Sequence, residues 1–246
     1  MIQRIFFVLT ILALATFGKA LCAQYNVEIP TMTAPVVVEL FTSQSCSSCP
    51  PADRILAQLA EKDNIIALGC HVSYWDHLHW KDTVSQDFCD MRQHGYAGQR
   101  GTKRIFTPQM VVNGQDEFVG SHANKIKTAL EKARSVTIKP IDINIENPDL
   151  VTFSLPSMKD KNYRLWAFGY QKFFKQDISS GENRGKSVPY VNSAITYTNL
   201  GGWSGDAISK SFALPEPPTE NKLDGIIIFA QIDGYGEIAA AGKIEF

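Results

Sequence analysis

The sequence has no basic block and no excess of charge of either sign. Its 246 residues include 24 Lys and Arg against 25 Asp and Glu, a formal net charge of −1. Without a basic face there is no electrostatic footprint for nucleic acid or for an anionic membrane, so we expect neither partner. Internal repeats and low-complexity tracts are absent as well. At 44% hydrophobic residues, the chain is neither disordered nor collagenous and can bury the core of one large or two ordinary domains.

The N-terminal apolar run is too short to cross a bilayer. Residues 5–17 are mainly apolar, whereas a spanning helix needs about 20 such residues. The run follows Arg4 and precedes small residues, which is typical of a secretory signal peptide at residues 1–23, cleaved after Ala23. A lipoprotein signal at Cys22 is the weaker interpretation, because Leu21 before it is not small. We expect a periplasmic or secreted chain with no stable membrane span after cleavage.

The hydrophobic pattern of residues 35–135 predicts alternating strands and helices. Apolar runs at 36–41 and 65–72 are typical of buried strands. Residues 107–114 and 117–119 predict a hairpin around an Asn-Gly turn. Apolar positions at helical spacing predict helices from the second cysteine of a pair onward, over about 84–97, and over 123–134.

From residue 136 the pattern changes to short alternating runs. About seven strands separated by turn-rich loops are typical of an antiparallel sandwich. We therefore predict an α/β domain at residues 35–135 followed by an all-β sandwich domain at residues 136–246. The expected strands lie at 137–145, 150–155, 163–170, 187–198, 207–214, 225–232 and 237–245.

Cysteine is scarce, with five residues in the chain, too few for a disulfide-dense miniprotein. Cys46 and Cys49 have C-x-x-C spacing between the first expected strand and a helix opened by Pro50 and Pro51. The thiolate is the nucleophile in disulfide exchange, and the N–H groups at a helix N-terminus stabilise its charge. In such a pair the first cysteine usually attacks and the second resolves the mixed disulfide. We predict that Cys46 attacks and that Cys49 resolves.

Two other interpretations of this pair stay open, an inert disulfide and half of a zinc site. A structural zinc site needs two further ligands, usually in a second closely spaced pair. Cys70, His71 and Cys89 offer candidate ligands, as do His77 and His79, but their spacing fits no standard module. We expect no metal.

The unit Val36–Pro51, followed by Thr107–Pro108 at the start of a later strand, resembles the thioredoxin superfamily. More narrowly, VELFTSQSCSSCPPAD at 38–53, the aromatic and charged residues of 71–82, TPQMVVNG at 107–114 and GENRG at 181–185 resemble a bacterial family of secreted thioredoxin-like proteins whose function is not established. The resemblance implies a Cys46–Cys49 redox pair and a cis-proline at Pro108. It also implies that Thr107 helps to bind the partner's extended chain. The two residues between the cysteines are both Ser, so the direction of electron flow stays open.

If Cys22 is removed with the signal peptide, the remaining cysteines divide into 46/49 and 70/89, an even number in an oxidising compartment. Cys70 lies on the second expected strand and Cys89 on the following helix. We consider a structural disulfide between them as one outcome. Two separate buried thiols are the other.

Residues 71–82 crowd aromatic, imidazole and carboxylate groups into one segment. Trp75 gives a large contact area with a polar handle, and we predict partner binding by Trp75, His71 and Asp76. His71 or Asp76 also suits proton transfer to or from the cysteines. The alternative is that the tryptophans of this segment pack against the core, which we favour for Trp80. In the GENRG loop, Arg184 either binds an anion or pairs with an acid, and we favour pairing.

We predict an exported thiol–disulfide oxidoreductase that acts on protein thiols or disulfides, with a membrane or periplasmic redox partner and no dissociable cofactor. One alternative is a non-catalytic secreted binding module with a permanent disulfide. Another is a thioredoxin-like protein that handles copper or zinc.

Overall fold

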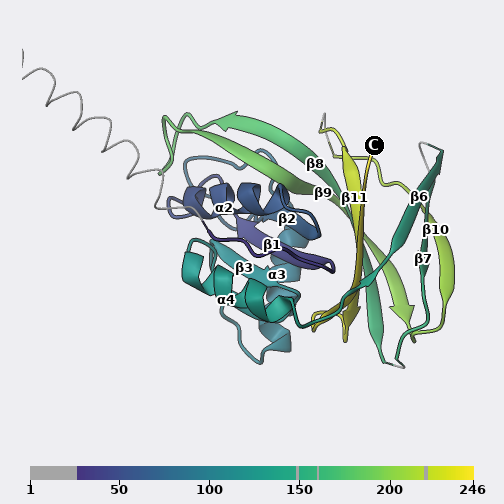
Figure 1. Ribbon diagram of the computed structural model, residues 1–246. Coiled ribbons are helices and arrows are strands. Elements are labelled where there is room, and N and C mark those ends of the chain that lie inside the picture. Colours follow the sequence, from purple (N-terminus) through teal and green to yellow (C-terminus); the bar gives the residue numbers. More distant parts are fainter. Residues whose placement is uncertain (1–26, 148–149, 160, 219–220) are drawn as a thin grey trace, which may run out of the picture.

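The structure is a computed structural model that describes residues 27–147, 150–159, 161–218 and 221–246, and the predicted signal peptide lies outside these ranges. Two sheets organise these residues (Figure 1): nine strands in the order β4-β3-β1-β2-β9-β8-β11-β12-β5 and three in the order β10-β7-β6. The helices are α2 (Pro50–Ala60), α3 (Asp87–Gln99) and α4 (Ala123–Ala133). The strands are β1 (Val36–Thr42), β2 (Ile65–His71), β3 (Gln109–Val112), β4 (Asp116–Val119), β5 (Lys139–Pro140), β6 (Asp142–Asn147), β7 (Leu150–Leu155), β8 (Tyr163–Asp177), β9 (Ser187–Trp203), β10 (Ile208–Ala213), β11 (Gly225–Ile232) and β12 (Ile238–Glu245).

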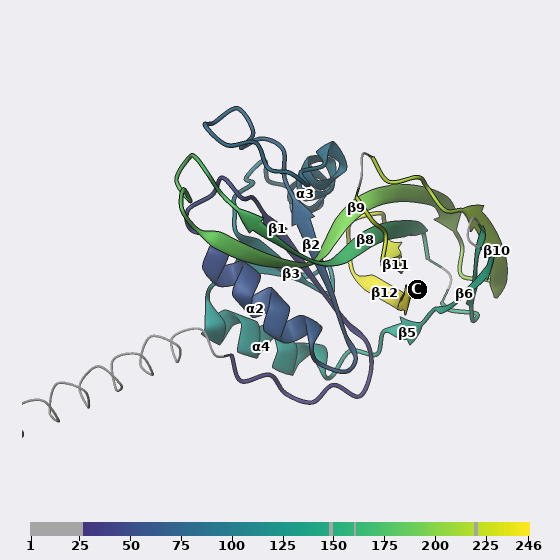
Figure 2. The same cartoon turned by 90° about the horizontal axis from the view of Figure 1, so that it is seen from above.

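The part of the large sheet formed by β4, β3, β1 and β2 is covered on both faces. This explains why β1 is buried along its whole length. Val36, Val38 and Leu40 point toward α2 and α4, in one core cluster. Val37 and Phe41 point to the opposite face, where α3 and the C-terminal strands complete a second cluster. Figure 2 shows α3 on one side of the sheet and α2 with α4 on the other.

A third cluster fills the space between the two sheets in the C-terminal half. Val151, Phe153 and Leu155, at alternate positions of β7, are buried against Leu165 of β8 and Ile228 of β11. Period-two alternation places these side chains on the one face of β7 that meets the larger sheet. The small sheet is thus fixed by its apolar face.

The large sheet continues across the boundary predicted near residue 135. β2 pairs in parallel with β9 through Gly69 and Ser193. Val191 O lies 3.3 Å from where a Cβ on residue 69 would be, so the absence of a side chain permits this close approach. The C-terminal strands are therefore joined directly to the N-terminal ones.

The element predictions are largely confirmed, and the differences have local causes. The run at 137–145 is split into β5 and β6 at Ile141, whose N–H donates to Ala241 O across to β12. The strands expected at 163–170 and 187–198 extend further, to Asp177 in β8 and to Trp203 in β9. The extra residues of β8 pair with the first residues of β9 and form a two-stranded ribbon that reaches over α2 (Figure 1).

Candidate functional site

The predicted cysteine pair lies between the end of β1 and the start of α2, in a segment we call the cysteine turn (residues 43–49). Cys46 and Cys49 form a disulfide with a Cα–Cα distance of 5.5 Å. Cys49 is the N-cap of α2, and Pro50 and Pro51 follow in the first turn, where a missing N–H costs no helical hydrogen bond. The pair therefore meets the N-terminal, positive end of the helix dipole.

Both cysteines are buried, with 2% of Cys46 and none of Cys49 exposed. Ser47 and Ser48 between them are exposed. The Ser48 hydroxyl oxygen lies 3.3 Å from Cys46 Sγ, which is close enough for it to donate a hydrogen bond to a Cys46 thiolate. The turn thus presents its serines to solvent and keeps its sulfur atoms just beneath them.

The segment before β3 lies at the same end of the sheet. The peptide bond between Thr107 and Pro108 is cis, as the sequence resemblance implied. Phe41 pairs with Gln109, so Pro108 comes directly beside the end of β1. Trp75 Nε1 donates to Thr107 Oγ1 at 2.9 Å. The structure therefore brings Trp75 and Thr107, two of the predicted partner-binding residues, into contact.

Beneath the cysteine turn is a buried cluster of ionisable side chains, Asp53 on α2, His71 on β2 and Asp82 in the segment before α3. His71 is 1% exposed, so it faces the interior and not a partner. His71 Nδ1 lies 2.8 Å from Asp82 Oδ2. Burial opposes protonation of His71, but the adjacent Asp82 carboxylate outweighs this and raises the pKa of the imidazole.

Asp53 was not among the residues singled out from the sequence. Its Oδ1 accepts a hydrogen bond from Thr42 Oγ1 at 2.8 Å, and its Oδ2 has no hydrogen-bond partner. Burial raises the pKa of this carboxyl to about 7. Asp53 N donates to Cys49 O, one helical turn back, and side chains on a helix lean toward its N-terminus. The carboxyl therefore leans toward the turn of helix that carries Cys49.

The segment between β2 and α3 holds the cysteine turn from one side. Asp82 Oδ2 accepts from Gln44 N at 2.8 Å, and Trp80 Nε1 donates to Gln44 Oε1 at 2.9 Å. Asp76 is occupied within the segment, since it accepts hydrogen bonds from Asp82 N and Ser85 Oγ. Asp76 thus positions Asp82. Trp80 packs against the small apolar cluster that includes Val188 and Tyr190, in line with the packing role favoured from the sequence.

The far end of the β8–β9 ribbon, which we call the ribbon turn (residues 178–186), covers the cysteine turn. Asn183 is fully buried, and its Nδ2 donates to Gln44 O at 2.8 Å and to Cys46 O at 2.9 Å. Glu182 Oε2 accepts from Ser47 N at 3.1 Å. Arg184, the residue considered from the sequence, is exposed. The contacts to the cysteine turn are made by the two residues that precede it, Glu182 and Asn183.

The second cysteine pair forms the disulfide that the sequence left open. Cys70 on β2 and Cys89 on α3 have a Cα–Cα distance of 5.4 Å and are both fully buried. The bond ties α3 to the face of the sheet opposite α2. Because this disulfide joins a strand to the helix that covers it, we consider its role structural.

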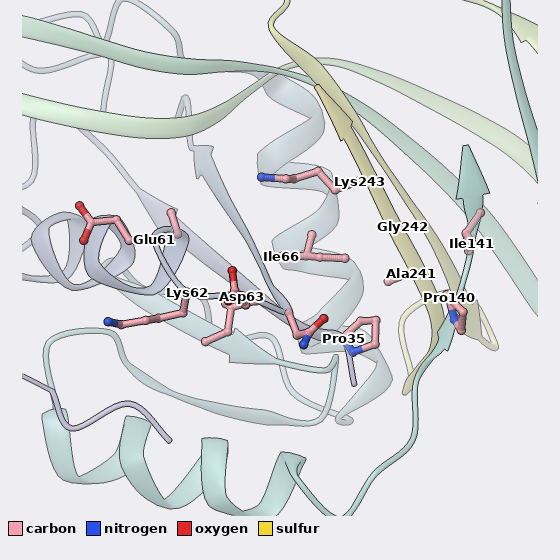
Figure 3. Close-up of a pocket in the computed structure, with 13 residues that line it drawn as sticks. Pro35, Glu61, Lys62, Asp63, Ile66, Pro140, Ile141, Ala241, Gly242 and Lys243 are labelled. Carbon is pink, nitrogen blue, oxygen red and sulfur yellow. The ribbon is translucent and has the colours of Figure 1, made fainter. Parts of the chain in front are cut away.

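An open pocket of about 420 Å³ lies at the other end of α2 from the cysteines (Figure 3). The end of α2 and the following loop form one wall, and β5 with β12 forms another. None of the predicted site residues lines it. The residues that line the pocket and are labelled in Figure 3 are Pro35, Glu61, Lys62, Asp63, Ile66, Pro140, Ile141, Ala241, Gly242 and Lys243.

Among the described residues, no group of three or more His, Cys, Asp or Glu side chains is arranged to hold a metal ion. No helix within the same ranges is both long and apolar enough to span a membrane.

The chain belongs to a family described as a protein of unknown function, DUF1223, whose model matches residues 37–231. It is similar to the crystal structure of protein AGR_C_4864 from Agrobacterium tumefaciens, with 24% identity and a TM-score of 0.74 over 87% of this chain and 96% of that one. HBP35 of Porphyromonas gingivalis is similar at 15% identity and a TM-score of 0.63, over 88% of this chain and 76% of that one. These identities show a shared fold alone. No curated protein matches.

Proposed function

We propose that this chain is an exported thiol–disulfide oxidoreductase of thioredoxin-like architecture. The observation that carries the proposal is the Cys46–Cys49 disulfide at the N-terminus of α2. A helix N-terminus stabilises a thiolate, which is the reactive species in disulfide exchange. The Ser48 hydroxyl beside Cys46 Sγ adds a donor to the same sulfur. Two disulfides in one chain are compatible with an oxidising compartment.

In the reducing direction, the Cys46 thiolate attacks one sulfur of a partner disulfide. The Cys46–partner bond forms, the partner's S–S bond breaks, and its second sulfur leaves as a thiolate that takes a proton from water. Cys49 then loses its proton and attacks Cys46 Sγ, which releases the first partner sulfur as a thiolate. The partner gains two electrons, and Cys46 and Cys49 lose two as their disulfide forms. The reverse sequence donates a disulfide.

The proton of Cys49 needs an acceptor in a site without bulk water. The Asp53 carboxyl lies one turn along α2, is buried, and has an oxygen without a hydrogen-bond partner. A pKa near 7 suits a group that takes and returns a proton at neutral pH. Asp53 is the residue of this cluster that we place in the exchange reaction, and His71 with Asp82 sets its electrostatic surroundings.

The partner chain would bind where Thr107, Trp75 and the exposed serines meet the surface. Trp75 and Thr107 are linked by a hydrogen bond, so the two are positioned together. An extended segment next to a cis-proline is the arrangement that the thioredoxin resemblance implies for partner binding.

The burial of both sulfur atoms supports a second candidate, a secreted binding module whose Cys46–Cys49 disulfide is permanent. The two candidates differ in reduction potential. Structural disulfides typically lie below about −300 mV, whereas catalytic pairs are less negative.

The deciding experiment is a redox titration of the protein lacking residues 1–23 against glutathione buffers, read by thiol trapping and mass spectrometry. Cys46→Ser and a Cys70→Ala/Cys89→Ala double variant serve as matched controls. We expect a two-electron transition within the glutathione range that is absent in Cys46→Ser and retained in the double variant. A Cys46–Cys49 pair that stays oxidised in every buffer would overturn the proposal in favour of the binding module.

A further inference from the structure

The ribbon turn brings a carboxylate to the cysteine turn from a distant part of the chain. Glu182 and Ser47 are 135 positions apart, and the Ser47 N–H donates to Glu182 Oε2 at 3.1 Å. Hydrogen bonding from Ser47 holds the pKa of Glu182 below its usual range, so this side chain is ionised at neutral pH. Since Ser47 N is bonded to the carbonyl carbon of Cys46, the negative charge is next to the attacking cysteine.

Asn183 fixes this arrangement. Its amide donates to two carbonyl oxygens of the cysteine turn, those of Gln44 and Cys46, and its Oδ1 accepts from Lys186 Nζ at 2.8 Å. Gly181 and Gly185 on either side have φ values of +73° and +80°, which glycine adopts without strain. The ribbon turn is therefore built to present Asn183 and Glu182 to the cysteines.

We propose that the ribbon turn tunes the redox pair, with Asn183 positioning the turn and the Glu182 carboxylate opposing formation of the Cys46 thiolate. This inference rests on the proposed function for its biological meaning. A nearby negative charge disfavours a second one, and Glu182 also occupies a backbone N–H beside the sulfur. A less stable thiolate makes the reduced pair less stable, so the pair becomes a stronger reductant. Glu182 is a positioning and tuning residue and forms no bond to the partner.

Other ionisable groups surround the cysteine turn and stay unchanged in the test. They are Asp53 on α2, His71 on β2, Asp82 in the segment before α3 and Lys186 on the ribbon turn. Lys186 favours the thiolate and the acids oppose it. Glu182 is the one whose carboxylate bonds to a residue between the two cysteines.

The direct test measures the acidity of Cys46 in a Cys49→Ser background, by the pH dependence of its alkylation, with and without Glu182→Gln. We expect Glu182→Gln to increase the acid dissociation constant of the Cys46 thiol about 3- to 10-fold, in line with a Coulomb interaction near the surface. Glu182→Asp should retain most of the wild-type value because it keeps the charge. Asp177→Asn, the same charge change elsewhere on the ribbon, is the matched control and should have no effect.

A measurement at high ionic strength distinguishes an electrostatic role of Glu182 from a structural one. In 1 M salt the Debye length falls to about 3 Å, so the difference between wild-type Glu182 and Glu182→Gln should shrink, which a purely structural role would not predict. Asn183→Ala should change the acid dissociation constant of the Cys46 thiol in the same direction as Glu182→Gln. Equal Cys46 acidity with and without Glu182→Gln, or a shift that Asp177→Asn reproduces, would overturn the inference.

The same variants with both cysteines present are then equilibrated with glutathione. Glu182→Gln should lower the equilibrium constant for disulfide formation, by the full 3- to 10-fold at a pH where the Cys46 thiol is ionised and by less at lower pH. If the wild-type pair never equilibrates but the acidity of Cys46 still responds to Glu182, the proposed function fails and the electrostatic inference stands. If the pair equilibrates with glutathione but the acidity of Cys46 does not respond to Glu182→Gln, the electrostatic inference fails and the proposed function stands.

Discussion

The two disulfides join Cα atoms at nearly the same distance but have different surroundings. Their Cα–Cα distances are 5.5 Å for Cys46–Cys49 and 5.4 Å for Cys70–Cys89, and all four cysteines are buried. The first pair lies at a helix N-terminus under two exposed serines. The second joins β2 to α3 within the main apolar cluster, beside Phe41.

Neither the Cα–Cα distance nor burial therefore distinguishes the disulfide that we propose to be reactive from the one that we consider structural. What differs is the charge that the surroundings accept and the length of chain that the bond closes. Cys46–Cys49 has the start of α2, the Ser48 hydroxyl and the buried Asp53 carboxyl beside it, whereas Cys70–Cys89, although Cys89 lies in the first turn of α3, is enclosed by an apolar cluster. Cys70–Cys89 closes a loop with a sequence separation of 19 against 3, so it constrains the unfolded chain more strongly.

The largest expected difference is in the rate of reduction. Under native conditions with dithiothreitol, we expect Cys46–Cys49 to be reduced on the order of 10³-fold faster than Cys70–Cys89, because exposing the second bond requires opening the core. Timed alkylation followed by peptide mass spectrometry measures both rates in one sample. Similar rates for the two pairs would remove the functional distinction between them.

The next difference concerns stability. Replacing the second pair, Cys70→Ala with Cys89→Ala, is expected to lower the free energy of unfolding by about 3–5 kcal/mol. The matched replacement of Cys46 and Cys49 by Ala should cost roughly 1–2 kcal/mol, because that loop is so short. Urea titrations of both double variants compare the two values. If the losses are reversed, the structural assignment of Cys70–Cys89 is wrong.

The order strand, cysteine pair, helix was predictable because local patterns dictate it. An apolar run buried on both faces gives β1, and two prolines mark the first turn of α2. The full length of β8 was not predictable, because its residues beyond 170 are exposed or half-buried and give no core pattern. The end of the ribbon is fixed instead by contacts to the cysteine turn, far away in sequence.

Of two site residues that were not predicted, Asp53 could have been recognised from the sequence and Asn183 could not. Asp53 breaks the apolar face of an otherwise amphipathic helix, a local conflict that often marks a functional position, so it could have been found. Asn183 lies in a glycine-flanked loop, and nothing nearby in the sequence indicates that it is buried. Only the fold brings it to Gln44 and Cys46.

The buried acid beneath the first disulfide predicts a pH dependence that the second disulfide does not share. The folded-state pKa of Asp53, about 7, lies above its ordinary value of 3.8. The folded protein therefore holds this proton more tightly than the unfolded chain, and stability is lost as pH rises from about 4 through 7. The raised pKa of His71 acts in the same direction, with stability lost as pH rises above 6.5.

Asp53→Asn should accordingly be more stable than the wild type at pH 8, by roughly 1–3 kcal/mol, and should gain nothing at pH 4. Exposed Asp63→Asn is the matched control. Free energies of unfolding from urea titrations at pH 4, 6 and 8 give the comparison. A constant difference between Asp53→Asn and wild type over this range would show that the carboxyl does not titrate as its burial requires.

The smallest expected effect concerns the surface around the first disulfide. Trp75→Phe keeps most of the aromatic area but removes the N–H that bonds to Thr107, so stability should fall by about 1 kcal/mol or less. Trp166→Phe removes a similar hydrogen bond, to Gly234 O in the C-terminal half, and is the matched control. If Trp75 and Thr107 together bind the partner, Trp75→Phe raises KM for a peptide disulfide several-fold and leaves the glutathione equilibrium unchanged. An unchanged KM would leave Trp75 a packing residue, and the surroundings of the two disulfides would then differ in their charges but not in partner binding.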